Sequence, residues 1–120
     1  MSLENEVPSL ELCKRWKEIG GRQDTCFSWE FFDKEKFSCL NDVWVLQSTA
    51  SILQEDECRV AAPLASELME WMKAILDISS TVEEWEIVMF QTCHLERSKS
   101  LPNALMQMAI WEKEAPCKNK

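Results

Sequence analysis

The chain has 120 residues, a net charge of −8 and 46% apolar residues, including six Trp, five Phe and six Met. This is the length of one ordinary domain, and so apolar a composition excludes a disordered chain. Nine acidic and two basic residues lie between positions 54 and 86. Because nucleic-acid binding depends on Lys and Arg, this charge argues against direct binding of DNA or RNA.

The first predicted element is a helix from Leu10 to Ile19. Ser9 is a suitable N-cap, and Gly20 and Gly21 are suitable residues to stop the helix. The next segment, residues 22–33, carries aromatic residues at alternate positions, as a strand does, but no partner strand is evident in the sequence. We therefore expect a packed aromatic connector or one helical turn there.

Four further helices are predicted along the rest of the chain. The second runs from about Asp33 to Gln54 and is apolar on nearly all sides, which indicates a central position or a partner on the second side. The third starts at Pro63 and ends at Ser79, and a one-turn start at Asp56 with a bend at the proline is the alternative. The fourth begins at Ser80 or Thr81, since either residue stands three positions before a Glu and can form a capping box, and ends near residue 97. The last follows residues 100–102 and ends before Pro116.

Short connections make consecutive helices antiparallel neighbours, and the scarcity of Gly and Pro disfavours an all-β fold. The sequence therefore predicts an all-α domain of about five helices, as an antiparallel helical bundle or a short stack of helical hairpins. We expect a flexible tail over 1–8, a single domain over 9–115 and a C-terminal tail over 116–120. The expected shared core is Leu46, Leu68, Trp71, Ile75, Trp85 and Val88.

The cysteine pattern bears on metal binding and on cellular compartment. The six cysteines form no Cys-x-x-Cys pair, and the chain has a single histidine. We therefore expect no metal site and no cofactor. The N-terminus lacks the basic start and apolar run of a signal peptide, and no stretch is apolar enough to span a membrane. These features favour an intracellular protein of the cytoplasm or nucleus with free thiols.

The adjacent residues Cys93 and His94 are candidates for a catalytic thiol–imidazole pair. On a helix they project about 100° apart, with Cys93 beside the inward face and His94 outward. A thiol–imidazole pair needs hydrogen-bond contact, so a buried thiol beside an exposed histidine is the better interpretation. We expect the chain not to be an enzyme.

The feature that favours a function is apolar residues lying off the inward face of the predicted helices. Ile87 and Phe90 fall off the face of Trp85 and Val88, and Met106 and Ile110 fall off the face of Leu105. One alternative is that these residues belong to a helix surrounded on all sides. The hypothesis is that Ile87, Phe90, His94, Met106 and Ile110 form an outer patch that binds a protein partner or a second subunit.

The sequence thus favours a non-catalytic protein–protein interaction domain, as an adaptor or a subunit of a complex. The alternative from another class is a small secreted helical signalling protein held by disulfides. The even number of cysteines permits it, whereas the absence of an Asn-x-Ser/Thr sequon argues against it.

Overall fold

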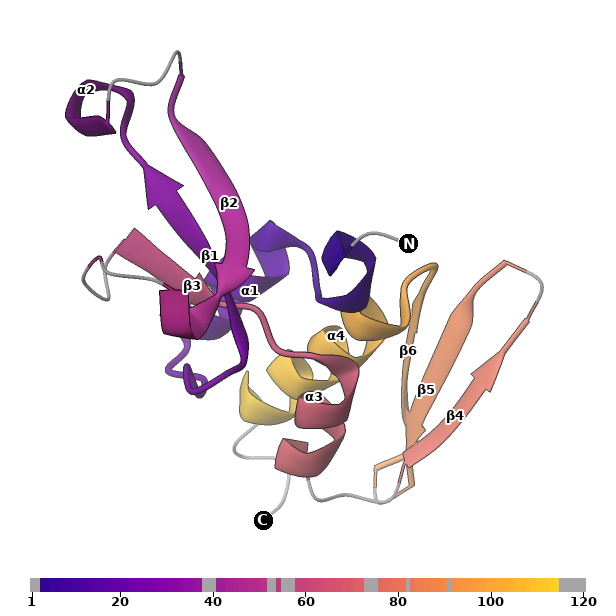
Figure 1. Cartoon of the computed structure of the whole chain (residues 1–120). Helices are drawn as coiled ribbons and strands as arrows, with labels where there is room; N and C mark the ends of the chain where they lie inside the picture. The colour runs from indigo at the N-terminus through magenta and orange to yellow at the C-terminus, as the bar shows by residue number, and fades with distance from the viewer. Residues whose placement is uncertain are drawn as a thin grey trace.

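The computed structural model describes residues 3–37, 41–51, 54, 58–72, 76–81, 83–90 and 92–114 of the chain. Within these residues, two three-stranded antiparallel sheets lie on either side of a group of helices (Figure 1). The prediction of an all-α helical bundle is therefore wrong. Among the described residues, no helix is long and apolar enough to cross a membrane.

The first sheet has the order β2-β1-β3 and is built on the aromatic segment. Its strands are β1 (Phe27–Phe32), β2 (Val43–Ser48) and β3 (Arg59–Ala61). Trp29 of β1 lies opposite Leu46 of β2 on one side and Val60 of β3 on the other. The predicted connector is therefore the central strand. Its partner strand β2 was not predicted from the sequence, because the apolar run in β2 fits a helical period as well as an alternating one.

The β1–β2 hairpin extends away from the helices and carries the short helix α2 (Lys34–Phe37) at its tip (Figure 1). Asp33, the first residue of the second predicted helix, accepts a hydrogen bond from the Glu35 N–H at 2.9 Å and so caps α2. Over residues 43–51 the predicted helix is replaced by β2 and by the 3-10 turn η2 (Thr49–Ser51).

The second sheet has the order β4-β5-β6 and replaces the fourth predicted helix. Its strands are β4 (Leu76–Ser80), β5 (Trp85–Met89) and β6 (His94–Ser98). Thr81 does bind backbone N–H groups, but in the turn between β4 and β5. Its Oγ1 accepts from Glu83 at 3.3 Å and Glu84 at 3.0 Å, and its own N–H donates to the Glu84 carbonyl at 2.8 Å. The capping sequence therefore closes a hairpin.

The first and last predicted helices are confirmed as α1 (Leu10–Glu18) and α4 (Leu101–Glu114). Ser9 caps α1 by accepting from the Leu12 N–H at 3.4 Å. Gly20 ends it with a φ of 84°, and the Gly21 N–H donates to the Trp16 carbonyl at 2.8 Å, which together form a Schellman motif. The third predicted helix is present only as α3 (Ala65–Met72), because the chain enters β4 soon afterwards.

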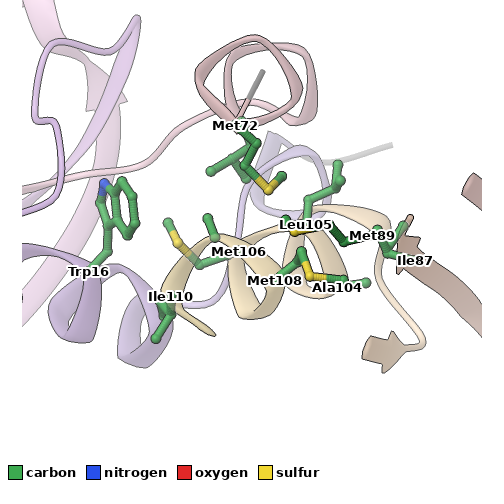
Figure 2. Close-up of a cluster of buried hydrophobic side chains, with 11 residues drawn as sticks. Trp16, Met72, Ile87, Met89, Ala104, Leu105, Met106, Met108 and Ile110 are labelled. Atoms are coloured by element: carbon green, nitrogen blue, oxygen red, sulfur yellow. The ribbon is translucent and has the colours of Figure 1, made fainter. Parts of the chain in front are cut away.

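The main core lies around α4, which contacts α1, α3, β5 and β6. Figure 2 shows α4 side chains among residues of α1, α3 and the second sheet. The buried residues of this core are Trp16, Leu68, Met72, Ile87, Met89, Ala104, Leu105, Met106, Met108, Ala109 and Ile110. The helix at the centre of this core is therefore α4, and not the second predicted helix.

The predicted shared core is divided in the structure. Leu68 is buried in the main core, with Trp71 and Trp85 packed against it, whereas Leu46 packs against a second cluster formed by Val7, Cys13, Val60 and Ala62. Val88 is only half-buried, and Ile75 lies outside the described residues. Val7 and Pro8, which the sequence assigned to the N-terminal tail, are buried. The predicted tail over 116–120 lies outside the described residues.

Candidate functional site

The five residues of the predicted outer patch have different surroundings. Ile87 and Met106 are 0% exposed and Ile110 is 8% exposed, so these three belong to the main core. His94 is half-buried, whereas Phe90 is 56% exposed. In the folded monomer, the structure therefore does not bring these residues together on one surface.

The strand period explains which neighbours Phe90 has. On a helix, residues three apart share a face, so Ile87 was grouped with Phe90; on a strand, residues two apart share a face. In β5, the alternating residues Trp85, Ile87 and Met89 pack against the main core. Val88 therefore belongs to the opposite face of the sheet, which faces away from α4 (Figure 1).

A small apolar surface forms on this outer face. Val88 lies directly opposite Leu95 of β6, which is 39% exposed, and Phe90 follows two positions after Val88 where the hairpin turns. Beside this pair, the Arg97 Nε lies 3.2 Å from Glu86 Oε2 in a cross-strand ion pair. We call Val88, Phe90 and Leu95 the Phe90 surface, with Glu86 and Arg97 as its polar rim.

His94 lies on the inner side of β6, against α4. Its ring is stacked on Trp111, with centroids 3.8 Å apart and planes 8° from parallel, and its Nε2 is 2.6 Å from Glu96 Oε2. The other oxygen of Glu96 accepts from Gln107 Nε2 at 2.9 Å. This network holds β6 on α4. The sequence-based orientation of His94 toward solvent is therefore wrong.

Cys93 lies in the turn after β5 and is exposed, not buried as expected from the sequence. Its φ of 60° is in the left-handed region, and its N–H donates to the Met89 carbonyl at 2.7 Å, which closes the turn before β6. The Cys93 Sγ donates to the Phe90 carbonyl at 4.0 Å, whereas the His94 ring contacts Glu96 and Trp111. The local geometry thus provides no thiol–imidazole pair.

A cleft of about 680 Å³ opens where α1, α3 and α4 begin. The Ser9 N–H donates to Asn103 Oδ1 at 2.6 Å at its edge. Lys99 and Glu6 are its charged residues, and Trp85 provides its largest apolar wall. Its other polar lining residues are Ser and Asn, and the Ser9 and Ser100 hydroxyls each accept a backbone N–H at the start of a helix. Sequence reasoning did not find this cleft, because it is assembled from segments far apart in the chain.

A second cleft, of about 300 Å³, lies beside stacked indoles. The Trp16 and Trp71 rings are 6.1 Å apart and 7° from parallel, and the Arg22 guanidinium lies 5.0 Å from the Trp71 centroid. Burial raises the pKa of Glu112, which lines the same cleft. Since Arg22 already covers Trp71, these contacts have a structural role.

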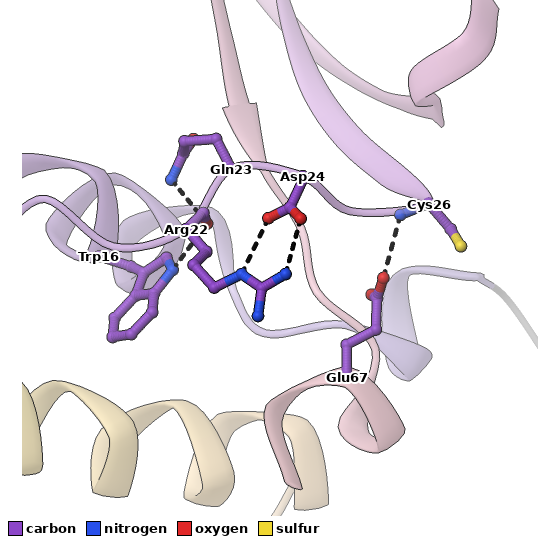
Figure 3. A network of polar contacts seen from close by, with 6 residues as sticks. All are labelled: Trp16, Arg22, Gln23, Asp24, Cys26 and Glu67. Carbon is purple, nitrogen blue, oxygen red and sulfur yellow. Dashed lines mark hydrogen bonds and ion pairs between the residues drawn. The ribbon is translucent and has the colours of Figure 1, made fainter. Parts of the chain in front are cut away.

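Figure 3 shows how the segment after α1 is held. The Arg22 carbonyl accepts from Trp16 Nε1 at 3.0 Å and from Gln23 Nε2 at 3.1 Å. The Arg22 side chain donates to both oxygens of Asp24, at 3.1 and 2.7 Å, and this hydrogen bonding lowers the pKa of Asp24. Glu67 of α3 accepts from the Cys26 N–H at 3.2 Å, which ties α3 to the chain entering β1.

No three His, Cys, Asp or Glu side chains come together as metal ligands within the described part of the chain. No known protein family, curated protein or solved structure matches this chain. Among the surfaces and clefts described above, the Phe90 surface is the candidate site.

Proposed function

We propose that the chain is a non-catalytic protein-interaction domain, an adaptor or a subunit of a complex, whose partner binds the Phe90 surface. The observation that carries the proposal is the exposure of Phe90, a large aromatic side chain that remains 56% accessible. Large apolar side chains that stay exposed next to one another often mark contact surfaces.

The neighbours of Phe90 support this interpretation. Val88 and Leu95 are a cross-strand pair that enlarges the apolar area, and the Glu86–Arg97 ion pair borders it. Aromatic anchors bordered by polar groups are typical of protein–protein interfaces, in which a few central residues supply most of the binding energy. Phe90 directly follows Met89, the last β5 residue that pairs with β6, so it continues the outer face of the hairpin at its turn.

The test is the change Phe90→Asp, with quantitative affinity capture from a cell extract and mass spectrometry to identify the partner. Because Phe90 is exposed, the variant is expected to fold with nearly unchanged thermal stability. Its affinity for the partner should fall by roughly 30-fold or more, as for a central interface residue. Met69→Asp on α3 is the matched control, since Met69 is also exposed, at 38%, but lies on another element.

Two outcomes contradict the proposal. A folded Phe90→Asp variant that captures the same partners with undiminished affinity rejects the Phe90 surface as the binding site. An equal loss of capture in Met69→Asp shows that the effect is not specific to this surface.

We further propose an intracellular location, in the cytoplasm or nucleus, in place of a secreted signalling protein. Cys13, Cys26, Cys58 and Cys93 are free in the structure, which is the state expected of thiols in a reducing compartment. Thiol titration of the denatured, unreduced protein purified from its native source tests this. Six free thiols support the proposal, and fewer support the disulfide-bonded alternative.

A further inference from the structure

The strand β2 is at the edge of the first sheet. Among the described strands, the sheet order β2-β1-β3 gives it one partner strand, β1, along its whole length from Val43 to Ser48. It belongs to the hairpin that projects from the helices (Figure 1). An edge strand presents backbone N–H and C=O groups that no neighbouring strand satisfies.

The register identifies which backbone groups of β2 point outward. The Thr49 N–H donates to the Cys26 carbonyl at 2.9 Å, just beyond the paired residues. In an antiparallel ladder such hydrogen-bonded pairs recur at every second residue, so Val43, Val45 and Gln47 direct their backbone groups toward β1. The N–H and C=O groups of Trp44, Leu46 and Ser48 therefore point outward from the free edge, in the plane of the sheet and away from β1.

Charge distinguishes β2 from the other strands. Of the six described strands, β2 is the one with no charged residue; the other edge strands contain Arg59 in β3, Asp77 in β4, and Glu96 and Arg97 in β6. Proteins commonly protect edge strands with charges, prolines or bulges. The strand β2 has no charge or proline, and it exposes Val43 (42%) and Val45 (38%) on one face.

We propose that β2 pairs antiparallel with β2 of a second copy of this chain, forming a continuous six-stranded sheet across a two-fold axis. The axis must be perpendicular to the sheet, so each face of one copy continues into the same face of the other. The register with most hydrogen bonds places Leu46 opposite Leu46 of the second copy and Trp44 opposite Ser48. The outward groups of these residues then all find partners.

A second copy of β2 matches this uncharged edge, because neither strand brings a charged side chain to the contact. The net charge of −8 on each copy opposes association, so only a contact free of charges is compatible with pairing. In this register no charged residue of β2 faces the partner, and Asp42, just before the strand, falls opposite Ala50. The apolar face containing Trp44 and Leu46 also continues across the axis.

The contact is expected to be weak. Six residues of strand extend only about 20 Å, and such an edge buries less than the ~800 Å² per partner of a standard stable interface. Dimerisation should therefore depend on concentration, with a dissociation constant in the micromolar range or above.

Sedimentation velocity of the full chain, from about 1 µM to about 1 mM, tests the proposal. The sedimentation coefficient should rise toward that of a dimer. Val45→Lys should weaken self-association at least tenfold, because it places a charged group opposite Gln47 of the second copy and diagonal to the same ammonium group of that copy. Its fold should persist, since Val45 is exposed and pairs with Glu30 of β1. Ser48→Pro removes an outward N–H and should have the same effect.

Leu95→Lys is the matched control, because Leu95 is as exposed as Val45 but lies on the second sheet. It should leave self-association unchanged while weakening partner capture at the Phe90 surface, so the two proposals fail independently. A wild-type chain that stays monomeric throughout overturns the pairing. So does undiminished association in folded Val45→Lys and Ser48→Pro, or a loss of association confined to Leu95→Lys.

Discussion

Truncation of two adjacent residues, Ile87 and Val88, tests the strand assignment of β5. Ile87 is 0% exposed and lies in the main core, whereas Val88 is half-buried on the outer face. If residues 80–97 were a helix with the faces expected from the sequence, Val88 would point inward and Ile87 outward. The two interpretations thus predict opposite orders of stability for Ile87→Ala and Val88→Ala.

The magnitudes follow from burial. Ile87→Ala removes three carbon groups from a fully buried site, about 2.5 kcal/mol of transfer free energy at ~0.8 kcal/mol per group. The cavity left behind brings the total to ~3–4 kcal/mol, within the ~2–5 kcal/mol seen for such truncations. Val88→Ala removes two groups that are already half exposed, and should cost about 0.8 kcal/mol.

Urea unfolding, followed by tryptophan fluorescence and far-UV circular dichroism, measures both losses. An unchanged dependence on urea concentration would show that each variant unfolds between the same two states. In thermal melts, Ile87→Ala should lower Tm by roughly 10–20 °C and Val88→Ala by less than about 5 °C. A Val88→Ala loss equal to or larger than that of Ile87→Ala would refute the inward orientation of Ile87.

Two further predictions concern α1 and its surroundings. A Cβ on Gly21 would overlap the Trp16 indole, so Gly21→Ala should displace that ring from the Arg22 carbonyl and cost ~1–3 kcal/mol in urea unfolding. Gly20→Ala, strained only by its φ of 84°, should cost ~1 kcal/mol, and a milder effect of Gly21→Ala would contradict the packing. Burial raises the pKa of Cys13 from 9.0 to about 12. Between these values the unfolded state binds fewer protons than the folded state, so the free energy of unfolding should fall by up to ~1.4 kcal/mol per pH unit above pH 9. The free energy of unfolding of the Cys13→Ala variant should fall less steeply with pH over that range. Equal slopes in the two proteins would contradict the burial of the thiol.

The helices that could be predicted from the sequence are those whose ends are specified locally. Ser9 and Gly20 form a cap and a stop through contacts within a few residues, so the first helix is readable from its own sequence. The last helix likewise begins after Ser100, whose Oγ accepts from the Asn103 N–H at 3.3 Å. These interactions need no distant partner.

The strands could not be predicted because their patterns fit two periods at once. In β2, four consecutive apolar residues from Val43 to Leu46 satisfy both a helical face and an alternating one. The deciding contacts, such as Phe31 against Trp44 at 5.0 Å between ring centroids, join residues distant in the sequence. Propensity is a weak guide where tertiary pairing decides. Without β2 as a strand, the alternation of Phe27, Trp29 and Phe31 had no partner.

The same ambiguity explains which part of the candidate site was found. Phe90 is exposed in the structure, as the sequence predicts. With a helical period it lies off the face of Trp85 and Val88, and with a strand period it falls on the outer face with Val88, so both periods direct it away from the core. Its neighbours depend on the period: Ile87 and His94 on a helix, Val88 and Leu95 in the hairpin. If the hairpin geometry governs binding, Leu95→Lys should weaken partner capture as Phe90→Asp does. Changes at His94 should instead act through the contact of β6 with α4, lowering stability before affinity. The residues that share a binding effect with Phe90 therefore depend on the secondary structure around it.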